Sequence, residues 1–216
     1  MKAYKGLMIG LLALGLSVAC STHPANTVAQ NVSQGPAKQD VPSSVPVGPG
    51  PVQYTVQQQP APGSCHYGKT ADGQPLPDRT CTPGATNPKV TAANLSDTIC
   101  KSGYTGGIRP GENITGPEKA ANIKSYGYTG DPRDAEYDHL ISLELGGDPD
   151  DPRNLWVEPP SPGHKQGAGT ANPKDTVENQ LHSLVCGKKI GLVDAQVAIA
   201  TDWTTALAKV GHPDGK

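Results

Sequence analysis

Residues 136–157 read EYDHLISLELGGDPDDPRNLWV, in which an Asp138-His139 pair precedes a double glycine and then Asn154. Neighbouring side chains of an extended strand point to opposite sides, so the pair offers two different groups from one place in the chain. A carboxylate holds a hard cation through oxygen, and a neutral imidazole accepts a proton from water near neutral pH. The pair therefore predicts metal-dependent hydrolysis of a phosphodiester, with Asp138 as metal ligand and His139 as general base.

The surrounding residues predict an α+β domain. Tyr137–Leu143 is expected to form a strand and Leu155–Val157 a second, with the glycine and aspartate loop 146–153 between them. A helix should begin at Pro173, because Asn172 can cap it and Asp175 can reach back to the cap. The order of strand, loop, strand and helix leaves a concave site between the strands and the helix face.

Two other helices are expected. One spans Thr115–Tyr126, with Pro117 and Glu118 in its first turn. The other spans about Val193–Lys209, so that the domain ends in a pair of helices. The helix that begins at Pro173 and this final helix should bury a set of apolar residues: Val177, Leu181, Leu184, Val185, Val197, Ile199, Ala200, Trp203 and Leu207. Trp156 is also expected in the core.

The helix that begins at Pro173 should supply further metal ligands. Glu178 and His182 are four residues apart and share one helix face, so either could complete a site with Asp138. His164, in a glycine-flanked loop, is an alternative that the backbone would hold less firmly. Asn154 is expected to orient the imidazole or to pin the loop.

Three basic residues are candidates for binding the substrate phosphate. Arg109 and Arg133 could clamp it through paired hydrogen bonds, or could simply neutralise neighbouring carboxylates. Lys174 could contact phosphate or serve only the start of its helix. Eight acidic residues lie between Asp131 and Asp151, and those of the loop itself are expected to be solvated.

The chain resembles the HNH, or ββα-metal, endonuclease superfamily. The residues that match the DH…GG…NL signature of that superfamily are Asp138, His139, Leu140, Gly146, Gly147, Asn154 and Leu155. A longer likeness, over about Cys100–Trp203, is to small exported bacterial proteins with a Lys-Asp-x-x-Glu-x-x-Leu-His helix, here Lys174–His182. The resemblance implies a ββα-metal core, with His139 as general base, Asp138 as metal ligand and Asn154 as the central asparagine.

The chain departs from that family at the third residue of the motif. A final histidine or asparagine usually follows the central asparagine by roughly nine residues, the spacing of a short strand-to-helix connection. Here that region is a loop with Gly163 and His164, and the expected helix begins later. The third metal ligand is therefore open between Glu178, His182 and His164.

The N-terminus predicts export. Lys2 and Lys5 precede an apolar run from Gly6 to Ala19, which is shorter than a membrane-spanning helix requires. Cys20 at the end of the run favours a lipoprotein signal over residues 1–20, with ordinary signal cleavage as the alternative. The protein should then be lipid-anchored to a bacterial cell envelope, at the outer membrane or in the periplasm, or be secreted. Residues 21–63, rich in Pro, Gln and Ser, predict a flexible tether, and 64–216 a single domain.

Four cysteines remain after Cys20, an even number that suits an oxidising compartment. Of the three possible pairings we favour Cys65 with Cys81, which closes a short loop, and Cys100 with Cys186, which clamps the ends of the domain. A structural zinc site is less consistent, because the chain has no Cys-x-x-Cys pair. With no Phe and a total of 48 Gly and Pro residues, the chain cannot form a large core, so disulfides should contribute much of its stability.

The sequence thus predicts an exported, monomeric nuclease that hydrolyses DNA, or alternatively RNA, with one divalent metal ion. Mg²⁺ is the expected ion, and Mn, Ni or Zn are alternatives. A net charge of −2 excludes a broad basic footprint, so little sequence preference and modest affinity are expected. Membrane contact should be through the lipid alone. The rival hypothesis is a non-catalytic envelope lipoprotein that keeps the scaffold as a binding or structural module.

Overall fold

The structure, a computed structural model, describes residues 44–215. It is a mixed α+β fold with two small antiparallel sheets and two disulfides. The strands are β1 (Gly68–Lys69), β2 (Pro75–Leu76), β3 (Glu136–His139) and β4 (Leu155–Glu158). The α-helices are α1 (Tyr104–Ile108), α2 (Glu112–Tyr126), α3 (Pro173–Cys186), α4 (Leu192–Thr201) and α5 (Ala206–Lys209). Three 3-10 turns complete the elements: η1 (Leu95–Asp97), η2 (Leu143–Leu145) and η3 (Trp203–Thr205).

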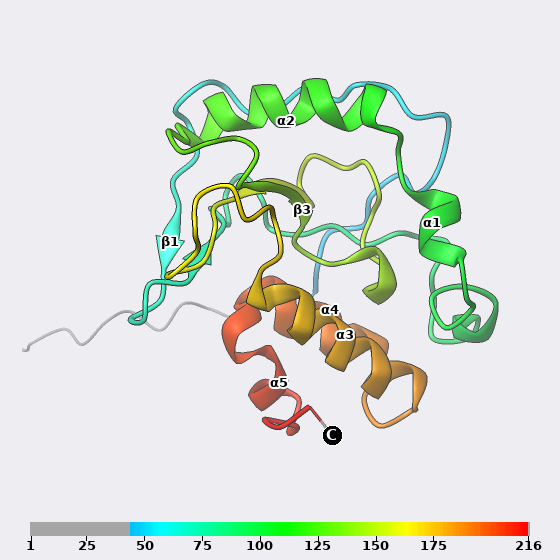
Figure 1. Ribbon diagram of the computed structural model, residues 1–216. Coiled ribbons are helices and arrows are strands. Elements are labelled where there is room, and N and C mark those ends of the chain that lie inside the picture. Colours follow the sequence, from blue (N-terminus) through cyan, green and yellow to red (C-terminus); the bar gives the residue numbers. More distant parts are fainter. Residues whose placement is uncertain (1–43, 216) are drawn as a thin grey trace, which may run out of the picture. The chain divides into compact units, whose positions relative to one another are not determined.

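The ribbon formed by β3 and β4 lies between two helical layers, with α2 on one side and α3 to α5 on the other (Figure 1). Its register pairs Asp138 with Trp156 and Glu136 with Glu158. Cross-strand partners share a face, so these four side chains lie on one side of the ribbon and His139 on the other. The ribbon and α3 therefore enclose the acidic face of β3.

The start of α3 confirms the prediction. Asn172 accepts a hydrogen bond from the backbone N–H of Lys174, Asp175 reaches back to the cap, and Pro173 occupies the first turn. By contrast, α2 begins at Glu112, earlier than expected, and Pro117 lies inside it. Proline suits the first turn of a helix, but α2 accommodates Pro117 in its second turn, where one main-chain hydrogen bond is lost.

The expected final helix is interrupted, so that prediction was wrong. Asp202 has an extended backbone, with φ −169° and ψ 104°, and separates α4 from η3 and α5. Its side chain accepts a hydrogen bond from the N–H of Thr204 at 3.0 Å, so it caps a new helical start in the middle of the apolar periodicity. The predicted strand over 137–143 also ends early, at His139.

The core lies around α3, α4 and the ribbon. Trp156 and Trp203 are both buried, as expected, and Trp203 donates its indole N–H to the carbonyl oxygen of Pro75 at 2.9 Å. Leu181, Leu184, Val185, Ile199 and Ala200 are buried too, whereas Val177, Val197 and Leu207 are only partly so. No helix within residues 44–215 has both the length and the apolar character needed to cross a membrane.

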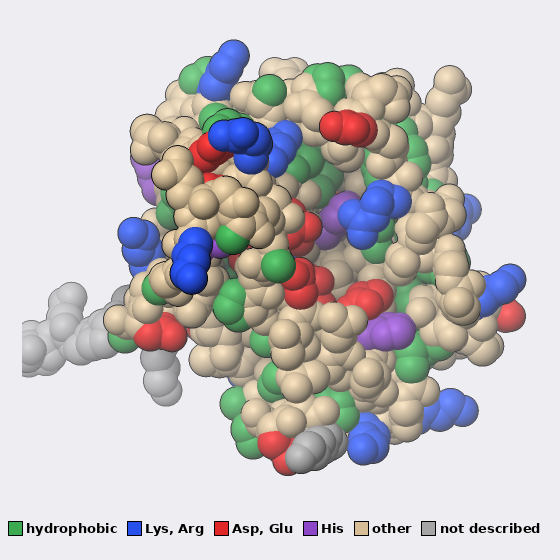
Figure 2. Space-filling model, in the orientation of Figure 1, with side chains coloured by type: hydrophobic (Ala, Val, Ile, Leu, Met, Phe, Trp, Pro, Cys, Tyr) green, Lys and Arg blue, Asp and Glu red, His purple; other side chains and the backbone are tan. Residues whose placement is uncertain are grey.

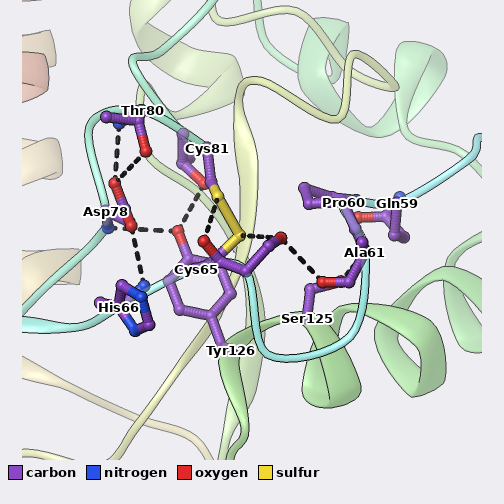
Figure 3. Close-up of a disulfide and its surroundings, with 12 residues drawn as sticks. Gln59, Pro60, Ala61, Cys65, His66, Asp78, Thr80, Cys81, Ser125 and Tyr126 are labelled. Carbon is purple, nitrogen blue, oxygen red and sulfur yellow. Dashed lines mark hydrogen bonds between the residues drawn. A yellow bond between two sulfur atoms is a disulfide. The ribbon is translucent and has the colours of Figure 1, made fainter. Parts of the chain in front are cut away.

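Both favoured disulfide pairings are present. Cys65 bonds Cys81, and Cys100 bonds Cys186, which joins the segment before α1 to the end of α3. The first bridge fastens a turn to the end of α2 (Figure 3): the N–H of Cys65 donates to the carbonyl oxygen of Ser125 at 3.1 Å. Asp78 supports the same turn by accepting from the N–H groups of His66 and Thr80, each at 2.8 Å.

The domain begins before Ser64, which corrects the expected boundary. Within 44–63, Gly48 donates its N–H to the carbonyl oxygen of Thr86 at 2.8 Å, and Tyr54 donates its hydroxyl to the carbonyl oxygen of Ile108 at 2.5 Å. Residues 44–63, the strap, lack a sustained apolar period, which is typical of a tether, but hydrogen bonds hold them to the domain. The signal segment and Cys20 lie outside the described residues.

Candidate functional site

The carboxylate of Asp138 forms an ion pair with a buried lysine. The ammonium Nζ of Lys174 lies 2.7 Å from Oδ2 of Asp138 and 2.9 Å from the carbonyl oxygen of His139, and it also contacts Oε1 of Glu178. The indole N–H of Trp156 donates to the same Asp138 oxygen at 3.2 Å. Lys174 is 1% exposed, so its ammonium serves these buried contacts and is not open to a phosphate, one of the two roles considered for it.

More carboxylates surround Lys174 than one ammonium can neutralise. Glu136 and Glu158 join Asp138 on the same face of the ribbon, and both oxygens of Glu158 are buried without a hydrogen-bond partner. Burial raises the pKa of Glu136 to about 7, and the charge of Asp138 adds to the rise. Burial also raises the pKa of Glu158 well above its usual value, with Asp138 again contributing.

His139 is held as a neutral imidazole. Its ring is buried, with 5% of its surface exposed, and Nε2 lies 3.0 Å from the carbonyl oxygen of Pro149. Because a carbonyl oxygen only accepts, Nε2 must carry the hydrogen, and Nδ1 then keeps the lone pair. Burial lowers the pKa of His139 to about 4, and the charges of Arg109 and Lys174 act in the same direction. The ring is therefore a free base at neutral pH.

Asn154 pins the loop, one of the two roles expected for it. Its Oδ1 accepts from the N–H of Ile141 at 3.0 Å and of Ala85 at 3.3 Å, while Nδ2 donates to the carbonyl oxygens of Ile141 at 3.0 Å and Asp148 at 2.9 Å. Just beyond His139, these side-chain hydrogen bonds replace the backbone hydrogen bonds between the two strands, which explains why β3 ends there. Asn154 thus acts by positioning the backbone on both sides of the imidazole.

The double glycine has a steric cause at each residue. Gly146 has φ +72°, the left-handed region that favours glycine, and it ends η2. A Cβ on Gly147 would lie 1.7 Å from the carbonyl oxygen of Ile141 and 2.8 Å from Nδ2 of Asn154. The two glycines therefore allow the loop to close against Asn154.

The loop aspartates are buried, which corrects the expectation that they are solvated. Asp148 is fully buried, and its Oδ1 accepts from the N–H groups of Asp150 at 3.1 Å and Asp151 at 3.0 Å. Its Oδ2 accepts from the N–H of Gly50 at 2.7 Å. These carboxylates satisfy main-chain donors of the loop and the strap, and so serve the fold.

A small cavity of about 200 Å³ opens beside the site. Arg109, Glu144 and Glu178 line it, and the buried hydroxyl of Ser142 on its wall has no hydrogen-bond partner. Figure 2 shows acidic side chains gathered around a hollow on this face, with basic and histidine side chains near them. The other residues that line the cavity are Thr105, Leu143, Asp175 and Asn179. The cavity thus places one guanidinium among three carboxylate side chains.

Other candidates from the sequence lie elsewhere. Arg133 pairs with Asp131 at 2.7 Å and its side chain is 87% exposed, while His164 lies 3.3 Å from Asp134. His182 points to the second disulfide: its Nε2 is 2.9 Å from the carbonyl oxygen of Ile99 and 3.3 Å from Sγ of Cys186. Asp138 and Glu178 therefore share one partner, Lys174, whereas His182 has different partners.

The expected metal does not fit the set of Asp138, Glu178 and His182. Lys174 already binds the two carboxylates, and His182 has other partners. Within 44–215, the one group of three metal-type donors close together is Cys100, His182 and Cys186, whose ligand atoms lie within 4.8 Å of one another. This group could hold a metal only after reduction, because disulfide sulfurs are not thiolates.

Sequence reasoning missed the roles of Lys174, Glu158 and Ser142. One signal was available, since Lys174 and Glu178 are four residues apart and must share a helix face.

In comparisons with known proteins, no family model, curated protein or solved structure matches the chain.

Proposed function

We propose that the protein hydrolyses phosphodiester bonds of nucleic acid, with His139 as the general base. The observation that carries this proposal is the fixed, neutral imidazole: Nε2–H is bound to the carbonyl oxygen of Pro149, so Nδ1 keeps the lone pair that a general base needs. An attacking water must be deprotonated in this way before it can displace the leaving oxygen in line.

Arg109 is the residue we assign to the substrate phosphate. It lines the cavity beside the site, and its charge acts on His139. A guanidinium can make two parallel hydrogen bonds to phosphate oxygens and offset the charge that develops on them. The hydroxyl of Ser142, on the same cavity wall, can donate a further hydrogen bond.

The substrate we propose is DNA, with RNA as the alternative, bound with little sequence preference. The net charge of −2 provides no extended basic surface, so affinity should be modest and set by local contacts at the cavity. We further propose that the protein works outside the cytoplasm as a monomer. Two disulfides are consistent with an oxidising compartment. We propose a lipid anchor at Cys20, with secretion as the alternative, from the sequence alone.

A second function, a non-catalytic envelope lipoprotein, has one observation in its favour. The carboxylate that would bind a catalytic metal is engaged by Lys174. In that case the scaffold would serve as a binding or structural module.

Incubation of the purified protein with plasmid DNA and with RNA separates the two functions. The reactions should run in EDTA and with each of Mg²⁺, Mn²⁺, Ca²⁺, Ni²⁺ and Zn²⁺. Cleavage that co-purifies with the protein supports hydrolysis. If neither nucleic acid is cut under any of these conditions, the non-catalytic function stands instead.

A further inference from the structure

We infer that Lys174 is a built-in cation that takes the place of a divalent ion between Asp138 and Glu178, and that this carboxylate pair binds no metal while Lys174 is present. The inference concerns the site of the proposed function. Its test measures metal binding and not cleavage, so either can fail without the other.

The hydrogen bonds of the ammonium are complete. A lysine ammonium has three N–H donors, and Nζ of Lys174 has three oxygen partners: Asp138, Glu178 and the backbone carbonyl of His139. Hard divalent ions prefer the same ligands, two carboxylates and a carbonyl oxygen. The oxygens that a metal would need are therefore already arranged around a cation.

Lys174 is also fixed and charged. It is 1% exposed and lies in the first turn of α3, whose start is set by Asn172 and Pro173. Burial lowers the pKa of Lys174, but the surrounding carboxylates outweigh that effect and hold the pKa above its usual value. A divalent ion bound to the same carboxylates would face this positive charge at close range.

Removal of the ammonium should convert the cluster into a metal site. Asp138 would then lie beside Glu178 and Glu158 without the ammonium that offsets their charge, and both oxygens of Glu158 already lack a hydrogen-bond partner. Neighbouring buried carboxylates repel each other, so they should take up either protons or a divalent cation. The variant Lys174→Met keeps most of the side-chain volume without the charge.

The experiment is titration of the protein with Mn²⁺, with free Mn²⁺ measured by electron paramagnetic resonance. We expect no saturable site in the wild type up to millimolar Mn²⁺, and none in the control Lys165→Met, which removes an exposed lysine. Lys174→Met should bind one Mn²⁺ at least tenfold more tightly than the wild type, and Mn²⁺ should raise its Tm.

Two results would overturn the inference. One is saturable Mn²⁺ binding by the wild type that Asp138→Asn abolishes. The other is a folded Lys174→Met that binds no more Mn²⁺ than the wild type. Should Lys174→Met fail to fold, the wild type and Asp138→Asn still decide, since absence of an Asp138-dependent site supports the inference.

Discussion

The side-chain amide of Asn154 and the backbone of Ile141 form two reciprocal hydrogen bonds, each 3.0 Å long. One side chain thereby imitates the main chain of a neighbouring strand, two residues beyond His139. Nδ2 of Asn154 also reaches the carbonyl oxygen of Asp148, the residue before Pro149. The orientation of the imidazole therefore depends on a residue that contacts only backbone.

Replacement of Asn154 by aspartate should destabilise the domain. Asp keeps the acceptor but loses the donor, so two buried carbonyl oxygens would face a carboxylate. Each buried group left unsatisfied costs roughly 1–3 kcal/mol, and we expect a loss of at least about 2 kcal/mol in the free energy of unfolding. Urea unfolding measures it, with the exposed Asn113→Asp as control. Equal stability of the two variants would contradict the role given to Asn154.

Gly147→Ala should be far more damaging than Gly106→Ala. The added Cβ at Gly147 would overlap the carbonyl oxygen of Ile141, whereas at Gly106 it would meet nothing within 4 Å. Overpacking of this kind costs roughly 1–3 kcal/mol, while alanine in a helix such as α1 is neutral or favourable. Thermal unfolding of both variants tests the difference. A similar Tm for the two would show that the loop can shift without strain.

Stability should fall as the pH rises from 6 to 8, in part because of Glu118. Burial raises the pKa of Glu118 to about 7, with the charge of Asp150 adding to the rise. A carboxyl group whose pKa is higher in the folded than in the unfolded protein makes its full contribution to stability at a pH below the unfolded pKa. This contribution is lost as the pH rises through the folded pKa. Glu118→Gln keeps the acceptor for the N–H of Gln57 and should flatten the dependence.

Urea midpoints at several pH values between 6 and 8 measure this effect. His139, whose pKa is lowered to about 4, contributes an opposite slope in the lower part of that window, because the unfolded imidazole still loses a proton near pH 6.5. That contribution is common to the wild type and Glu118→Gln, so the difference between their two slopes reports Glu118. An unchanged slope in Glu118→Gln would mean that this carboxyl does not take up a proton on folding.

The two arginines singled out from the sequence should behave differently. Arg109 lines the cavity, whereas Arg133 is paired with Asp131 in solvent. Loss of a phosphate contact should lower kcat/KM by about tenfold or more in Arg109→Ala, since a charge-assisted hydrogen bond contributes roughly 1.5–3 kcal/mol. Arg133→Ala should cleave like the wild type. The kinetics of an oligonucleotide substrate check both, and equal effects would remove Arg109 from the site.

Local patterns predicted the fold where one short segment determines the outcome. The cap of α3 was predictable because Asn172, Pro173 and Asp175 act within one turn. The continuous apolar periodicity of the last helix concealed the break at Asp202, because a single side-chain cap overrode it. The strap before Ser64 was missed because its hydrogen bonds to distant parts of the chain leave no periodic signal in the sequence.

The candidate site was predictable in its residues and less so in their partners. Asp138, His139 and Asn154 were all identified, but which cation Asp138 meets depends on how α3 packs against β3. Sequence spacing places Glu178 beside Lys174 on one helix face, yet only packing brings Asp138 to that lysine and directs His182 to the second disulfide. Partners across elements are set by tertiary structure, which spacing along the chain does not encode.

The most direct test of the central claim is the rate at which His139→Ala cleaves a nucleic-acid substrate. The wild type and His66→Ala, which changes an exposed histidine, are the controls. Loss of a general base removes on the order of a hundredfold or more in rate, so His139→Ala should be slower by at least that factor. His66→Ala should match the wild type. Undiminished cleavage by a folded His139→Ala would contradict the account.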